Sequence, residues 1–416
     1  MHARRESASF RPGVPSRGAK RGRITLFIGT GGHMPGDDHP ATHLQYLPSM
    51  TSDYSRISDT AKAIDPFIKP ALLSYLASLP LSSAGRQLGS PFVIADYGAA
   101  DGVNSSQLLE QIIRFLRQAH PLLGIRLVYI DIADPAPFHH FWKNSGLSGL
   151  PRVEAEYLQR SFYEPLPELA GNVDIGISST SLHWLNTKTV DTTFFYHPTC
   201  IQANQLPAAE RKKFYSKWIS DWRVFFRERS RDLAHGGMLY LATLTDLGGD
   251  RWPASAGYNN LREVCVSLYQ EGRISKQELD AIFIPDYFAT PDEIASLVAE
   301  ESISQHFSLK SLKTLTVPCA YSSRMQNAGN DARKRHYLAY SLARVVRAWS
   351  ESSIRVGLSR DNEGLIDEIY RRLAERFFER PEGLPYQYCL MELLRRNTPA
   401  GTEGFGPGKG TGALQT

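Results

Sequence analysis

Short hydrophobic runs alternate with amphipathic stretches through the first part of the chain. Four runs have the length and composition of buried strands: Phe92–Ala95, Ile125–Ile132, Val173–Ile177 and Met238–Leu244. Between them, apolar residues recur at helical spacing, first on Leu108, Leu109, Ile112, Ile113 and Leu116, and later on Phe214, Trp218, Trp222 and Phe225. Gly236 and Gly237 are expected to end the second of these helices. The alternation predicts an α/β fold with a doubly wound sheet.

Helical patterns dominate the second part of the chain, with two exceptions. Residues 308–318, SLKSLKTLTVP, alternate like an edge strand, and residues 384–394, LPYQYCLMELL, supply a last strand. Thr290, Pro291 and Glu293 mark the start of a helix, because a threonine cap, a proline in the first turn and a glutamate three residues after the cap form a capping box.

These patterns predict an α/β core carrying an inserted helical cap. Residues 49–79 have apolar positions at helical spacing, interrupted by Pro66 and Pro70, and are expected to form an N-terminal helix that lies over a site. We expect the following division: a disordered basic tail at 1–45, the α/β core with its lid helix at 46–249, cap segments at 250–288 and 321–380, a core helix and edge strand at 289–320, the last core strand at 381–396, and a flexible tail at 397–416.

A glycine turn between the first strand and its helix is the first candidate site. Asp96, Gly98, Ala100 and Gly102 give the pattern D-x-G-x-A-x-G. Such a turn lets a ligand approach the backbone at the carboxyl end of a strand, and a carboxylate there suits an ammonium or sulfonium group better than a pyrophosphate. Asp131 closes the second strand, where an acidic residue can accept hydrogen bonds from ribose hydroxyls. A purely structural turn and a solvated strand-end aspartate are the alternatives.

Charge and cysteine usage exclude several classes of protein. The formal charge of the chain is +4, but its first 23 residues carry +6, so the remainder carries −2 and implies no nucleic-acid partner. The cysteines are widely spaced, which argues against a structural zinc site and a disulfide framework: Cys200, Cys265, Cys319 and Cys389. No apolar run approaches the ~18 residues of a membrane span, so we expect no membrane and a cytoplasmic location.

Four segments, in order, resemble the SABATH family of plant carboxyl methyltransferases, which methylate salicylic, benzoic, jasmonic and indole acetic acids and caffeine precursors. The segments are IADYGAADGVN around Asp96, YIDIADPAPFHHF around Asp131, RSFY at Ser161 and SSTSLHWL from Ser178. The likeness spans about residues 54–395. It implies a class I methyltransferase with a Rossmann-like sheet, S-adenosyl-L-methionine as the methyl donor, a small carboxylic acid as the acceptor, and a homodimer.

The resemblance also implies roles for individual residues. Those that would bind the donor are Tyr54, Ser58, Asp96, Gly98, Asp131, Ile132, Ser161, Phe162 and Ser178. Among them, Asp96 and Gly98 would hold the methionine end, and Asp131 would hold the ribose. Those that would face the acceptor are Thr180, His183 and Trp184.

The sequence departs from the family pattern at several positions. Ala61 stands where the family has a glutamine that helps to bind the acceptor carboxylate, and Thr180 replaces an aromatic residue or cysteine. Ile130 and Asp131 stand where the family has Asn-Asp. A metal reported in some relatives would involve Asp280, but Ile282 and Phe283 are not the expected neighbours, so no metal is predicted.

The chemistry of carboxyl methylation requires positioning rather than a base. A carboxylic acid has a pKa near ~4 and is already an anion at neutral pH. The indole N–H of Trp184 can fix one carboxylate oxygen, and His183 can donate from a ring nitrogen. A phenolic or ring-nitrogen acceptor would instead need His183 as a base. A relative that binds the donor without catalysis, and a nicotinamide-dependent oxidoreductase disfavoured by the lack of G-x-G-x-x-G, are further alternatives.

Overall fold

The computed structural model describes residues 50, 54–79, 90–249, 252–358 and 363–397 of the 416-residue chain. All of them belong to one compact unit. The predicted tail at 1–45 lies outside the described residues, as does nearly all of the predicted tail at 397–416. The predicted division into core and cap segments stays a prediction, and the elements of the described residues are as follows.

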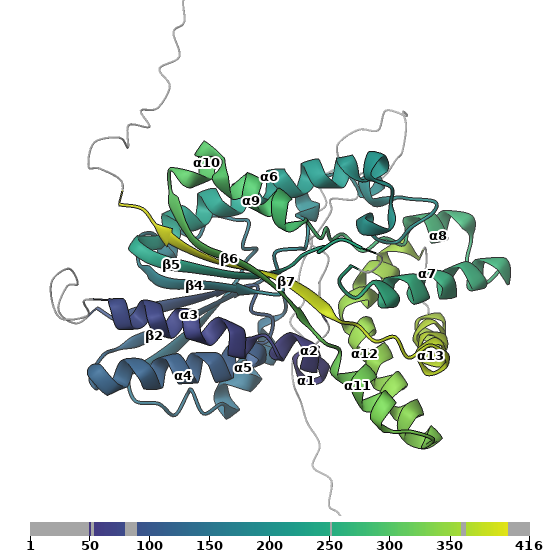
Figure 1. The fold of residues 1–416 in the computed structure, drawn as a ribbon, viewed down its shortest axis with the longest axis horizontal. Coiled ribbons are helices and arrows are strands. Elements are labelled where there is room, and N and C mark those ends of the chain that lie inside the picture. Colours follow the sequence, from purple (N-terminus) through teal and green to yellow (C-terminus); the bar gives the residue numbers. More distant parts are fainter. Residues whose placement is uncertain (1–49, 51–53, 80–89, 250–251, 359–362, 398–416) are drawn as a thin grey trace, which may run out of the picture. The chain divides into compact units, whose positions relative to one another are not determined.

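A seven-stranded sheet forms the centre of the described fold, in the order β3-β2-β1-β4-β5-β7-β6 (Figure 1). The five strands from β3 to β5 are parallel, whereas β7 is antiparallel to both β5 and β6. The strands are β1 Phe92–Tyr97, β2 Ile125–Asp131, β3 Val153–Gln159, β4 Val173–Ser179, β5 Leu233–Leu244, β6 Phe307–Val317 and β7 Tyr386–Arg395. The predicted α/β class and doubly wound sheet are confirmed.

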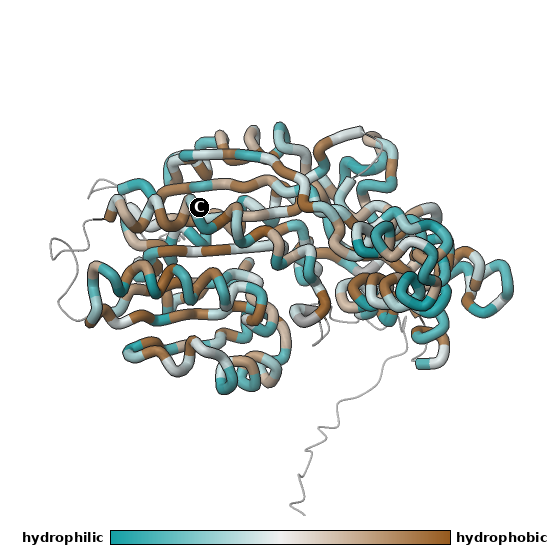
Figure 2. Tube along the Cα trace, turned by 60° about the horizontal axis from the view of Figure 1, so that its bottom comes forward, coloured by the Kyte–Doolittle hydropathy of each residue, from teal (hydrophilic) through white to brown (hydrophobic). Residues whose placement is uncertain are grey.

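Successive residues of the central strands enter different hydrophobic cores. Phe92 and Ile94 of β1 pack on one side of the sheet, and Val93, Ala95 and Tyr97 pack on the other. This alternation follows from the two-residue period of a strand, and burial of both faces explains why these strands read as continuous hydrophobic runs. In Figure 2 the strands carry long hydrophobic stretches, whereas hydrophobic and hydrophilic residues alternate along the flanking helices.

Helices cover both faces of the sheet. One core includes residues of α3 Asp65–Ser78, α4 Val103–Ala119 and α5 Pro135–Asn144, and the other includes residues of α6 Ala208–Asp232, α9 Pro291–Ala299 and α10 Glu301–Ser304. Two single turns, α1 Tyr54–Ile57 and α2 Asp59–Lys62, precede α3. Thr290 caps α9 and forms the predicted capping box with Glu293.

The remaining helices contact one another and form the cap (Figure 1). They are α7 Ser255–Gln270, α8 Lys276–Ala281, α11 Ala320–Asn327, α12 Ala332–Gly357 and α13 Glu363–Glu379. The α7 and α8 pair follows β5 in sequence, and the other three follow β6. Tyr258 of α7 and Trp349 of α12 join the two segments through a ring contact of 4.7 Å between centroids. Helix α12 also contacts α1, which brings the cap beside the start of the described fold.

The structure corrects two expectations from the hydrophobic pattern. Helix α6 ends at Asp232 rather than at Gly236, and Leu233 already pairs with Val173 in the sheet. The register shifts between this pair and the next, so that Gly236, with φ of +77°, belongs to an irregular start of β5. Strand β3 was not predicted, because polar residues occur throughout VEAEYLQ and only Val153 is buried in this edge strand.

Candidate active site

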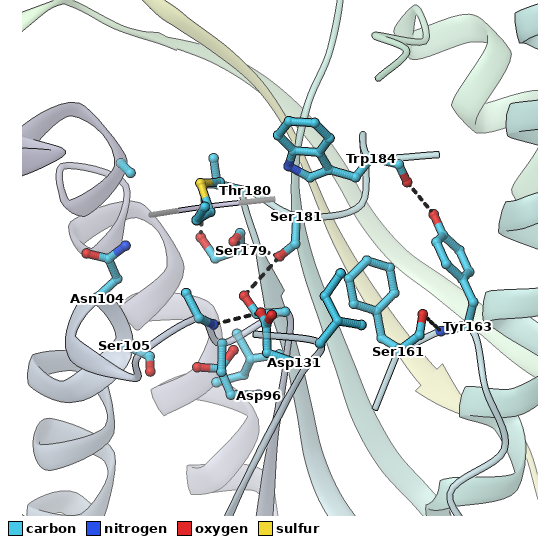
Figure 3. Close-up of a pocket in the computed structure, with 18 of the residues that line it drawn as sticks. Asp96, Asn104, Ser105, Asp131, Ser161, Tyr163, Ser179, Thr180, Ser181 and Trp184 are labelled. Carbon is cyan, nitrogen blue, oxygen red and sulfur yellow. Dashed lines mark hydrogen bonds between the residues drawn. The ribbon is translucent and has the colours of Figure 1, made fainter. Parts of the chain in front are cut away.

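A cavity lies where the carboxyl ends of β1, β2 and β4 meet the α1–α3 segment and helix α12 (Figure 3). Its empty space, including the mouth, is about 1190 Å³. The edge at which parallel strands end is where open α/β sheets bind ligands. Among the described residues, the charged side chains that line the cavity are those of Asp65, Asp96 and Asp131, and no lysine, arginine or histidine lines it.

The glycine turn after β1 forms one wall of this cavity. Gly98 has φ of +86° and Gly102, the residue before α4, has φ of +79°, a region that L side chains adopt at a cost. A Cβ atom on Gly98 would lie 2.4 Å from both Cβ and Oγ of Ser181. Gly98 is therefore required for two reasons: the backbone conformation and the close approach of the loop after β4.

Asp131 holds the glycine turn against the end of β2. Its Oδ2 accepts a hydrogen bond from the backbone N–H of Ala100 at 2.8 Å, and its Oδ1 accepts one from Ala133 at 2.9 Å. Burial raises the pKa of this carboxyl group above its ordinary value, although the backbone N–H groups oppose the shift. Asp131 thus orders two loops at the rim of the cavity in addition to facing it.

Asp96 and Asp65 bring two further carboxyl groups to the same cavity. Asp96, the penultimate residue of β1, is 6% exposed, and burial raises its pKa to about 6, with the Ser105 hydroxyl opposing the shift and the charge of Asp131 adding to it. Asp65 is the first residue of α3. Burial, followed by the charge of Asp96, raises the pKa of Asp65 to about 7. Both carboxyl groups therefore ionise less readily than a solvated aspartate.

The loop after β3 supplies a second wall. Ser161 and Phe162 line the cavity, and Ser161 Oγ accepts a hydrogen bond from the backbone N–H of Tyr163 at 3.1 Å. The Phe162 ring packs edge-on against Phe225 of α6, with centroids 6.0 Å apart. Phe162 therefore presents a ring to the cavity from a position fixed by the opposite helical layer.

The loop after β4 supplies the third wall. Ser179, Thr180 and Ser181 line the cavity, whereas Ser178 does not and its hydroxyl donates to the backbone carbonyl of Tyr97 at 2.8 Å. Thr180 has φ of +58°, and its hydroxyl lies 2.9 Å from the Tyr388 hydroxyl of β7. Ser178 thus ties the end of β4 to β1 and leaves the next three residues at the cavity.

Trp184 lines the cavity, but its neighbour His183 does not. Trp184 pairs with Asp286 in an isolated antiparallel bridge, and the Trp184 N–H donates to the Ser181 carbonyl at 3.1 Å, which places Leu182 and His183 in a turn. The indole Nε1 is buried without a hydrogen-bond partner among the described residues. The His183 ring is buried beside Phe288, 5.5 Å between centroids, and burial lowers its pKa to about 3. His183 is therefore neutral.

Some residues of the α1–α3 segment line the cavity and others do not. Ala61 lines the cavity, as does Ile132 from the end of β2. Ser58 is buried, but it does not line the cavity, and its Oγ has no hydrogen-bond partner among the described residues. The side chain of Tyr54, the first residue of α1, lies outside the part of the chain that the structure describes.

Comparison with known families identifies this arrangement. Residues 153–394 match the family model described as SAM dependent carboxyl methyltransferase. The chain belongs to this family. It is therefore an S-adenosylmethionine-dependent carboxyl methyltransferase, and the nicotinamide-dependent alternative is wrong. Among the described residues there is no group of three or more histidine, cysteine or acidic side chains that could hold a metal, and no helix is long and apolar enough to cross a membrane.

Individual relatives of this carboxyl methyltransferase are distant in sequence. It is 24% identical over 305 residues to benzoic acid/salicylic acid carboxyl methyltransferase 3 of Petunia hybrida, a match that covers 68% of this chain and 78% of the relative. It is 19% identical over 360 residues to salicylate carboxymethyltransferase of Clarkia breweri, covering 82% and 96% of the two chains. A solved loganic acid methyltransferase with SAH shares the fold, with a TM-score of 0.65, 17% identity and coverage of 83% and 97%.

The carboxyl methyltransferase cavity brings together eight of the residues singled out from the sequence. They are Asp96, Gly98, Asp131, Ile132, Ser161, Phe162, Thr180 and Trp184. Ser58, Ser178 and His183 lie outside the lining. Sequence reasoning did not single out Asp65, Asn104 or Ser105, which also line it. Asn104 is the last residue of the IADYGAADGVN segment, so its place after the glycine turn could have pointed to it. Asp65 reads as an ordinary acidic residue in the first turn of a helix.

Proposed function

We propose that this enzyme converts the carboxylate of a small aromatic acid to its methyl ester. The observation that carries the proposal is the Trp184 indole N–H, a buried donor without a described partner in the wall of the cavity. Figure 3 shows Trp184 across the cavity from Asp96 and Asp131. A buried unpaired donor costs about 1–3 kcal/mol, and an acceptor carboxylate oxygen would remove that cost. The related enzymes from Petunia hybrida and Clarkia breweri are named for benzoic and salicylic acids.

The residues at the strand ends fit S-adenosylmethionine. Asp96 and the Gly98 turn would hold its methionine moiety, because an ammonium needs acceptors and the missing Cβ leaves room beside the backbone. Asp131 and Ile132 would hold the ribose, and Ser161 and Phe162 the adenine. Ser178 would act indirectly, through Tyr97, and Tyr54 and Ser58 would close the α1–α3 segment over the donor.

The bound donor supplies an electrophilic methyl group, and the residues of this chain position the acceptor for its transfer. Trp184 would hold one carboxylate oxygen and Thr180 would contact the acceptor from the loop after β4. No general base is needed, because the acid is an anion at neutral pH. Positioning in a water-excluded cavity lowers such a barrier by up to roughly 7–11 kcal/mol.

His183 lies beside Trp184 in its neutral form, which favours a supporting role for His183 over a role as a base. The two rings lie 5.5 Å apart, and the low pKa of His183 makes it a weak proton acceptor. This argues for a carboxylate over a phenolic or ring-nitrogen acceptor, which would require deprotonation. Direct contact between His183 and the acceptor remains a prediction from the sequence, as do a homodimer and a cytoplasmic location.

The test is methyl transfer from labelled S-adenosylmethionine to a panel of aryl and alkyl acids, phenols and ring-nitrogen compounds. We expect labelled ester from at least one aromatic acid and no product from phenols. Product only from phenols or ring nitrogens would overturn the carboxylate assignment. Tight binding of S-adenosylhomocysteine with no product from any acid would instead indicate a protein that binds the donor without catalysis.

A further inference from the structure

Asp65 places a third carboxyl group in the cavity, and the donor site proposed above leaves it without a role. It is the first residue of α3, on the segment that would close over the donor. Its carboxyl group has no hydrogen bond or ion pair with any described residue. By contrast, Asp59 of α2, six residues earlier in the chain, does not line the cavity and pairs with Arg324 at 2.9 Å. The Asp65 carboxyl group therefore faces the cavity without a protein partner in the described part of the chain.

The neighbours of Asp65 make a cation the fitting ligand. Asp65 and Asp96 line the same cavity, and burial, followed by the charge of Asp96, raises the pKa of Asp65. No lysine, arginine or histidine of the described residues lines the cavity and offsets these charges. Two carboxyl groups that share a poorly solvated site repel each other when ionised, and a bound cation removes that repulsion.

Asn104 supplies an independent sign of a ligand with N–H groups. It lies in the first turn of α4 and lines the same cavity as Asp96, and Figure 3 shows Ser105 between these two residues. Its Oδ1 atom is buried and has no hydrogen-bond partner among the described residues. Asp65, Asp96 and Asn104 thus offer acceptors from three separate elements. An ammonium group has three N–H donors and no acceptor, so it can donate to these acceptors. A sulfonium group has no N–H donor.

We propose that Asp65 is a further donor-binding residue, which together with Asp96 and Asn104 holds the α-ammonium group of the methionine moiety. This inference rests on the proposed placement of the donor. Asp65 would give α3 a direct charge contact with the donor. Closure of the α1–α3 segment would then depend on the amino-acid moiety of the donor.

Calorimetric titration of the full-length protein at pH 8 tests this assignment. The ligands are S-adenosylmethionine, S-adenosylhomocysteine and 5′-methylthioadenosine, which keeps the adenosine and sulfur but lacks the amino-acid moiety. For Asp65→Asn we expect a tenfold or greater loss of affinity for the first two ligands alike, and a change of less than about twofold for 5′-methylthioadenosine. Asp65→Glu, which keeps the charge, should recover part of the lost affinity.

Asp59→Asn is the matched control, because it makes the same change on the same segment outside the cavity. Equal losses in both variants, or equal losses for all three ligands, would show a general disturbance and overturn the inference. A loss for S-adenosylmethionine alone would place Asp65 at the sulfonium and overturn it as well. Wild-type protein that binds neither donor nor product would refute the proposed function itself, whereas normal binding by Asp65→Asn would refute only the role of Asp65.

Discussion

The Arg229 guanidinium donates a hydrogen bond to the backbone carbonyl of Glu164, 2.9 Å away, although the two residues lie 65 positions apart in sequence. Arg229 also donates to the carbonyl of Phe162 and pairs with Asp232 at 2.6 Å. Asp232 in turn accepts a hydrogen bond from the Tyr97 hydroxyl at 3.0 Å. A buried network on α6 thus sets the position of the loop that presents Ser161 and Phe162 to the cavity.

Arg229→Lys should therefore weaken donor binding without touching the cavity. Lysine keeps the charge but lacks the planar fork that reaches two carbonyls and a carboxylate together. We expect at least a tenfold loss of affinity for S-adenosylhomocysteine by calorimetry. We also expect a loss of up to about 3–5 kcal/mol in the free energy of unfolding, the range for disrupting a buried ion pair. Arg227→Lys on the exposed side of α6 is the control, and an equal loss of affinity there would contradict the role of Arg229.

Gly98→Ala should abolish donor binding through a clash in addition to backbone strain. The new Cβ would lie 2.4 Å from the Ser181 side chain, so the turn or the loop after β4 must move. Gly171→Ala separates the two effects, because Gly171 also has a positive φ, +68°, but a Cβ there meets no atom within 4 Å. Each variant should lose about 1–2 kcal/mol of stability from the left-handed conformation. Denaturant unfolding and calorimetry together test this: if Gly98→Ala still binds S-adenosylhomocysteine like Gly171→Ala, the close approach has no functional part.

Trp184→Phe should affect the acceptor far more than the donor. The substitution keeps an aromatic ring but removes the buried Nε1–H, and a hydrogen bond to a charged group contributes about 1.5–3 kcal/mol. With an acid accepted by the wild-type enzyme, KM for that acid should rise roughly 10- to 100-fold, while KM for the donor stays within about twofold. Trp142→Phe, on α5 and outside the cavity, should change neither. Equal increases in both constants for Trp184→Phe would remove it from the acceptor site.

Donor affinity should rise with pH between about 5 and 8. The pKa of Asp96 is raised to about 6 and that of Asp65 to about 7, chiefly by burial, so both carboxyl groups become ionised across this range and attract the cationic donor. Because both folded-state pKa values exceed the unfolded values near ~4, the ligand-free protein is stabilised by these two groups at low pH and loses that stabilisation as pH rises toward 7. Calorimetry near pH 6.5 in two buffers of different ionisation enthalpy should show proton release on donor binding, and proton uptake would contradict the assignment.

Several local features were predictable because neighbouring residues alone produce them. The capping box of Thr290 and Glu293 starts α9 as expected, and the alternating residues of β6 lie at the sheet edge. The end of α6 was not predictable from Gly236, because pairing of Leu233 with Val173 in the sheet overrides the glycine signal. Propensity sets where a helix can end, and strand pairing with a distant segment determines where it does end.

The sequence by itself determined the α/β class, the glycine turn at Asp96 and the family to which the enzyme belongs, because these depend on the order and spacing of nearby residues. Only the tertiary structure decided which side chains share the cavity. It brings Asp65 of α3 and Asp96 of β1 to one cavity, and it places Trp184, which pairs with Asp286, in the cavity wall while His183 stays outside it. The physical reason is that the direction of a side chain depends on the segment packed against its backbone, and in both cases that segment lies far away in sequence.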